Sequence, residues 1–154
     1  MLNQLLPRHV DNTYRGYTLA LWLFAAVVIM KLGIGLNSIF NGRLVASSAD
    51  GIPLDTFSPA ASQAVVSLFA ILGLAQLMIC LLCTVVLARY RAIIPFMFAV
   101  LLLEHLGRRL IFLAMPIVRS GTPPGSFVNL VLLALMTVGL ALSLRGHDNP
   151  QAKE

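Results

Sequence analysis

Residues 56–88 read TFSPAASQAVVSLFAILGLAQLMICLLCTVVLA and contain no charged side chain. A helix rises about 1.5 Å per residue, so about 20 apolar residues cross a hydrocarbon core about 30 Å thick. Ser58 and Pro59 form a typical helix start, in which a capping residue is followed by a first-turn proline. We therefore predict a membrane-spanning helix over about residues 62–88.

Three other apolar stretches have the length of a span, at about residues 17–40, 92–115 and 125–144. The link RYR, residues 89–91, is so short that the second and third spans must form an antiparallel hairpin. These patterns predict an all-α fold, a single integral membrane domain over residues 1–154. The simplest packing is a four-helix bundle that runs down-up-down-up, with an outer loop over 41–61 and a polar C-terminal tail over 145–154.

The composition agrees with a membrane protein. Hydrophobic residues make up 58% of the chain and charged residues 11%, whereas soluble domains carry about a quarter charged residues. The net charge of +5 comes from basic residues at the ends of the apolar stretches. Because these residues form no basic run with interleaved aromatics, we expect no nucleic-acid partner, and the first partner is the lipid bilayer.

The positions of the basic residues predict the orientation of the chain. Short loops on the cytoplasmic side carry an excess of lysine and arginine. Arg43 and Arg119 fall on one side of the predicted spans, and a larger group falls on the other. We therefore expect both termini to be cytoplasmic in a plasma (inner) membrane, on the side of the larger group: Arg8, Arg15, Arg89, Arg91, Arg145 and Lys153.

Polar residues recur at a similar depth in every predicted span. Most of them lie 13 to 17 residues from a basic residue at the cytoplasmic end, which places them about 20 to 25 Å into the membrane. Ionisable groups at such depth are costly and mark functional sites by default. The sequence thus predicts one polar layer, made by Lys31, Gln76, Glu104, His105, Arg108, Arg109 and Asn129.

Glu104 precedes Arg108 by four residues, which is the favoured orientation for an ion pair along a helix. This pair would leave Lys31 and Arg109 without a counter-charge, so the layer predicts a pocket for an anionic lipid or anionic small molecule. A purely structural interpretation stays open, because long basic side chains can extend toward the headgroups.

Cys80 and Cys83 match the C-x-x-C spacing. With four spans, this pair superficially resembles the quinone-linked membrane disulfide oxidoreductases, which would imply thiol oxidation. The chain departs from that family because its pair lies inside a helix in the cytoplasmic half, away from the helix N-terminus that stabilises a reactive thiolate. We expect both thiols to serve in packing, without a disulfide.

Four spans with one membrane carboxylate, Glu104, also resemble the small multidrug resistance transporters, which exchange protons for cationic drugs. That family places the carboxylate in the first helix, whereas here it lies in the third, beside two arginines that repel a cation. His105 is the one histidine within a predicted span, too few for a haem or zinc site. We expect no cofactor and no metal.

The sequence favours a non-enzymatic membrane bundle that binds a lipid, an anionic small molecule or a partner protein through the polar layer. The partner protein includes a second copy of the chain or another membrane protein. Two alternatives remain open: a quinone-linked thiol oxidoreductase acting through Cys80 and Cys83, and a proton-coupled small transporter acting through Glu104 and His105.

Overall fold

The computed structural model describes residues 12, 14, 16–119, 121 and 123–145. Within this part of the chain the protein is all-helical and contains no strand. Three helices are long and apolar enough to cross a membrane, namely α2 (Thr18–Phe40), α4 (Pro59–Arg89) and α6 (Gly125–Leu144). A fourth long helix, α5 (Ile94–Ala114), carries Glu104, Arg108 and Arg109 and is therefore less apolar.

The start of α4 follows the capping chemistry of its sequence. The Ser58 hydroxyl accepts a hydrogen bond from the Ala61 backbone N–H at 3.2 Å, and Pro59 is the first residue of the helix. The predicted N-cap residue, Ser58, and the predicted first-turn proline, Pro59, are thus confirmed, and α4 begins three residues before the predicted span. A 3₁₀ turn, η3 (Arg91–Ile93), leads from the end of α4 directly into α5.

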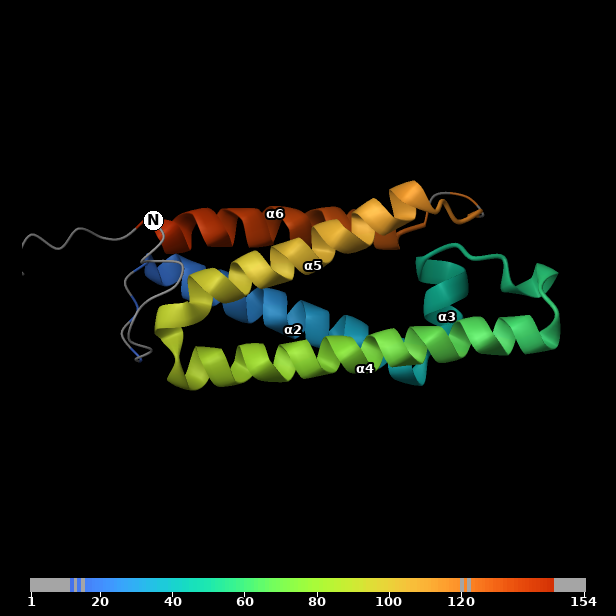
Figure 1. Ribbon diagram of the computed structural model, residues 1–154, viewed down its shortest axis with the longest axis horizontal. Helices are drawn as coiled ribbons and strands as arrows, with labels where there is room; N and C mark the ends of the chain where they lie inside the picture. The colour runs from blue at the N-terminus through green and yellow to red at the C-terminus, as the bar shows by residue number, and fades with distance from the viewer. Residues whose placement is uncertain (1–11, 13, 15, 120, 122, 146–154) are drawn as a thin grey trace, which may run out of the picture.

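The four long helices lie side by side (Figure 1). Helix α2 packs mainly against α4 and α6, and α5 packs mainly against α6. Helices α4 and α5 leave their link together, and Figure 1 shows that they diverge toward the opposite end. Helices α4 and α5 make few contacts with each other.

All four long helices contribute to one hydrophobic core. The rings of Phe24 and Phe98 meet edge to face there, with their centroids 5.0 Å apart. On α4 the core includes Cys80 and Cys83, and on α6 it includes Met136. On α5, Leu101 and Phe98 belong to this core, whereas Leu103, Leu106 and Leu110 are exposed.

Residues 42–56, which we call the cap, were predicted as part of an outer loop, but they are largely helical. The cap consists of α3 (Gly42–Leu44), the π-helical η1 (Val45–Ala49) and the 3₁₀ turn η2 (Leu54–Thr56). It forms a small apolar core of its own against α4, built from Ala46, Ile52, Leu54, Val65, Val66 and Phe69. This burial supplies the free energy that orders the segment.

The cap also reaches the first residue of α6. A Cβ atom built on Gly125 would lie 2.6 Å from the Ala49 carbonyl oxygen and 3.1 Å from Asp50 Oδ1. The backbone N–H of Asp50 donates to the Val45 carbonyl at 3.0 Å, and Gly51 turns the chain with a φ of 70°. The cap therefore contacts both α4 and the start of α6.

Asp50 gives the cap a pH dependence. Burial raises the pKa of its carboxyl above the ordinary value, against the opposing effect of Arg119 and Arg108. A raised pKa in the folded state means that ionised Asp50 weakens the cap once the pH exceeds that pKa, whereas the protonated form does not. We expect the amide hydrogen-exchange protection of residues 45–52 to decline as the pH rises above the ordinary pKa of an aspartate, and Asp50→Asn to abolish this decline.

Asp55→Asn is the matched control, because Asp55 is fully exposed and pairs with the exposed Arg43 at 3.5 Å. Exposed pairs contribute little, so its exchange protection should equal that of the unmodified protein. Lower protection in the Asp50→Asn variant at pH 7 would instead mean that the ionised carboxylate holds the cap through the arginines.

Candidate functional site

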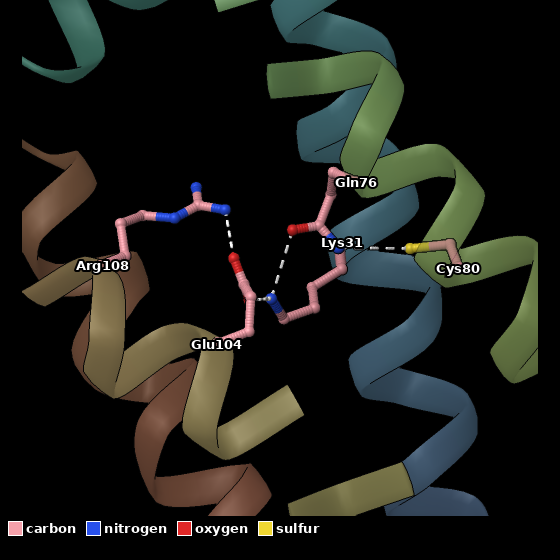
Figure 2. Close-up of polar contacts among 5 residues, drawn as sticks. All are labelled: Lys31, Gln76, Cys80, Glu104 and Arg108. Carbon is pink, nitrogen blue, oxygen red and sulfur yellow. Dashed lines mark hydrogen bonds and ion pairs between the residues drawn. The ribbon is translucent and has the colours of Figure 1, made fainter. Parts of the chain in front are cut away.

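The centre of the candidate site is a lysine buried between three helices. The Lys31 side chain on α2 is 5% exposed, and its Nζ donates to Glu104 Oε2 on α5 at 2.7 Å. The same ammonium donates to Gln76 Oε1 on α4 at 3.3 Å. Figure 2 shows the three side chains converging from their separate helices. The sequence-based expectation that these three residues meet at one depth agrees with this geometry.

Glu104 is shared between two cations. Its Oε2 accepts from Lys31, and its Oε1 accepts from Arg108 Nη2 one turn further along α5. The predicted pair of Glu104 and Arg108 is therefore present (Figure 2). The expectation that Lys31 would lack a counter-charge was wrong, because a residue from a separate helix supplies it, and contacts between helices leave no local sequence pattern.

Gln76 joins the ion pairs to the apolar core. Its Oε1 accepts from Lys31, while its Nε2 donates to Cys80 Sγ at 3.7 Å, a weak hydrogen bond to sulfur (Figure 2). Both Cys80 and Cys83 are buried and free of disulfides. Their position inside the core gives the thiol-oxidation alternative no geometric support.

Two glycines bring α2 and α4 close enough for this contact. A Cβ atom on Gly73 would lie 2.7 Å from the carbonyl oxygen of Gly35, a distance that real Cβ atoms do not adopt. Gly35 is one turn from Lys31, and Gly73 is one turn from Gln76. The backbones therefore approach where small residues face each other, as in membrane helix pairs, and the short Gln76 side chain reaches the ammonium.

The remaining predicted members are placed differently. His105 is buried beside the cluster and interacts electrostatically with Lys31 and Glu104. Arg108 is 46% exposed, and both Arg109 and Asn129 are exposed, without a hydrogen bond to the cluster among the described residues. The far ends of α5 and α6 are exposed on nearly all sides, so depth alone does not bring Arg109 and Asn129 inside.

Sequence reasoning missed the acidic residue that faces these arginines. Asp50 of the cap interacts electrostatically with Arg119 and Arg108, although it is far from both in the sequence. Arg119 also lies over the Phe112 ring, with its guanidinium carbon 5.4 Å from the ring centroid. The residues Asp50-Gly51-Ile52-Pro53 are typical of a turn, but a turn pattern does not indicate which distant arginines the Asp50 carboxylate interacts with.

The described residues contain no group of three or more histidine, cysteine, aspartate or glutamate side chains that could hold a metal ion. Comparison with protein-family models found no match, and comparisons with curated proteins and with solved structures found none either.

Proposed function

We propose that the chain is a four-helix bundle that crosses the plasma (inner) membrane four times, with both termini on the cytoplasmic side. Helices α2, α4 and α6 have the length and hydropathy of spans. Helix α5 runs beside α6 over a comparable length and directs its carboxylate to Lys31 (Figure 1). Pairing reduces the cost of placing charged groups within the hydrocarbon core, which supports α5 as the fourth span.

The orientation part of this proposal rests on the charge count. Arg89, Arg91 and Arg145 lie at the ends of the described helices, on the side opposite to Arg43 and Arg119. Three further basic residues of the count, together with most of the predicted C-terminal tail, lie outside the described residues: Arg8, Arg15, Lys153 and the tail segment 146–154.

We further propose that the bundle binds an anionic group at Arg108 and Arg109. The observation that carries this proposal is the sharing of Glu104 between Lys31 and Arg108. Glu104 alone cannot neutralise Lys31, Arg108 and Arg109. Asp50 of the cap also interacts with Arg108, but it is shared with Arg119, so an excess of positive charge remains at the exposed arginines. Lys31, Glu104 and Gln76 then form a buried support that positions Arg108, instead of acting as ligand contacts themselves.

The geometry suits an anion because guanidinium groups offer several donors in a fixed plane and match phosphate or carboxylate oxygens. Two successive residues on a helix differ in direction by about 100°, so Arg108 and Arg109 present their groups on adjoining sides of α5.

Replacing Arg108 and Arg109 together by glutamine should remove this function. We expect inorganic phosphate or a negatively charged phospholipid to raise the melting temperature of the unmodified protein in neutral detergent, because a ligand that binds the folded state stabilises it. The double variant should lose at least about two thirds of that increase. Thermal unfolding followed by intrinsic fluorescence of Trp22 measures the change.

Arg43→Gln is the matched control, since Arg43 is an exposed arginine that belongs to the cap. It should retain the full response to anions. If neither phosphate nor an anionic lipid stabilises the unmodified protein, or if the double variant responds as strongly, the anion-binding proposal is wrong.

A further inference from the structure

One face of α5 changes from buried to exposed along its length. Residues spaced three or four apart form a single stripe on this face. Met97 and Leu101, at the start of the stripe, are almost fully buried, whereas Ile111 and Met115, at its end, are 60% and 71% exposed. Arg108 lies at the transition, one turn beyond Glu104. The stripe that faces the other helices near the link thus has no helix against it at the far end.

Helix α4 also carries exposed apolar side chains beyond the ion pairs of Lys31. On α4, Leu72 lies one turn from Gln76 in the direction of the cap, and it is exposed. Figure 1 shows α4 and α5 separating toward this end. Leu72 is 17 residues before the end of α4 at Arg89, and Ile111 is 17 residues after the start of α5 at Ile94, so they lie at a similar level on the two helices. Both diverging helices therefore carry an exposed apolar side chain beyond the ion pairs of Lys31.

The cap lies over the end of this separation that faces away from the link. It is anchored on α4 through Ile52 and Leu54, and its residues Ala49 and Asp50 touch the start of α6. The Asp50 carboxylate interacts electrostatically with the same guanidinium, that of Arg108, that we assign to the ligand. An anion arriving from water would meet this backbone and its negative charge first.

From these observations we propose that the ligand is a phospholipid with an anionic headgroup, which enters sideways from the bilayer between α4 and α5. Its phosphate binds Arg108 and Arg109, and the first part of its acyl chain lies between Leu72 and Ile111. This inference rests on the proposed anion-binding function. A lipid satisfies both features of the region, since it neutralises the arginines and covers the apolar stripe, whereas a free anion does only the first.

The experiment compares three probes on the full-length protein in dodecyl maltoside: dioleoylphosphatidylglycerol, dioleoylphosphatidylcholine and inorganic phosphate. We expect phosphatidylglycerol to raise the melting temperature by about 5 °C, and the other two to raise it by less than about 1 °C. Native mass spectrometry of the same samples should show phosphatidylglycerol retained in preference to phosphatidylcholine.

Two variants test the acyl-chain contact. Ile111→Ser removes an apolar side chain from the stripe, and it should weaken phosphatidylglycerol binding by at least about threefold, as expected for the loss of buried apolar area. Leu103→Ser is the matched control, because Leu103 is 72% exposed, lies about 12 Å from Ile111 along α5 and, one residue before Glu104, points about 100° away from the stripe. It should bind the lipid as the unmodified protein does.

The outcomes separate the two proposals. If phosphate stabilises the protein as strongly as phosphatidylglycerol does, and through Arg108 and Arg109, the anion site stands and the lipid inference is overturned. Equal stabilisation by both phospholipids, or equal weakening by Ile111→Ser and Leu103→Ser, also overturns the lipid inference. If no probe acts through the arginines, both proposals fail together.

Discussion

Replacing Glu104 by glutamine is expected to lower the free energy of unfolding by about 3 kcal/mol. The carboxylate is the charged partner of Lys31, whose side chain is 5% exposed, at an Nζ to Oε2 distance of 2.7 Å. Without it, the ammonium stays buried against apolar helices with Gln76 as its remaining partner. Removing one member of a buried pair costs more than the pair contributes, because the other charge is left uncompensated.

Equilibrium unfolding in mixed micelles with increasing dodecyl sulfate would measure this loss. Lys31→Met combined with Glu104→Gln supplies the decisive comparison. Lys31→Met removes the ammonium charge that Glu104→Gln leaves buried without its carboxylate partner. We expect the double variant to be more stable than Glu104→Gln alone by at least about 1 kcal/mol. Additive losses would show that Lys31 and Glu104 do not stabilise each other.

Arg108→Gln is the control for position on α5. Its guanidinium is 46% exposed, and a partly exposed pair with Glu104 contributes little net stability. We expect a loss below about 1 kcal/mol. This difference between Glu104 and Arg108 would identify the carboxylate as a structural anchor and the arginine as the group left available to a ligand.

Replacing Gly73 by valine should have an effect of similar size, about 3 kcal/mol. A Cβ atom at this position would meet the Gly35 carbonyl oxygen at 2.7 Å, and the Ile39 and Ser38 side chains at 3.0 Å. The backbone of α2 cannot rotate aside as a flexible side chain does, so α2 and α4 must separate. Because Gln76 is one turn away, its 3.3 Å hydrogen bond with Lys31 should be lost as well.

Gly33→Val and Gly107→Val are controls with the same substitution. A Cβ atom at either position would have no neighbour within 4 Å. The same unfolding measurement should give changes within about 0.5 kcal/mol for both, as for surface positions in general. A loss at Gly33 or Gly107 equal to that at Gly73 would argue against a close approach of α2 and α4.

The glycines show where pattern reasoning stops. Gly33, Gly35, Gly73, Gly107 and Gly139 all qualified as sites of close helix contact by residue type. Gly35, Gly73 and Gly139 lie against a neighbouring helix, with the Phe98 ring covering Gly139, but Gly33 and Gly107 face open space. A small residue permits an approach without requiring one, so the partner helix decides which glycines are used.

The charged layer shows the same division. The sequence by itself determined that the chain is helical, and three of the four predicted spans have the length and hydropathy of a membrane-crossing helix. It also predicted that Lys31, Gln76 and Glu104 come together, and Lys31 contacts both of the others. These properties follow from composition and from the fixed rise of a helix, which are local. Lys31, Gly35 and Ser38 lie three or four residues apart, so helix geometry places them on one face of α2, and all three are buried.

The tertiary structure alone decided how the charges pair. Glu104 forms ion pairs with both Lys31 and Arg108. Asp50 of the cap interacts electrostatically with Arg108. Arg109 and Asn129 are exposed and lie outside the cluster. Each outcome depends on which helices touch and where α4 and α5 diverge. Such contacts join residues far apart in the chain, and their energies arise from packing and desolvation in the assembled protein, which no segment contains on its own.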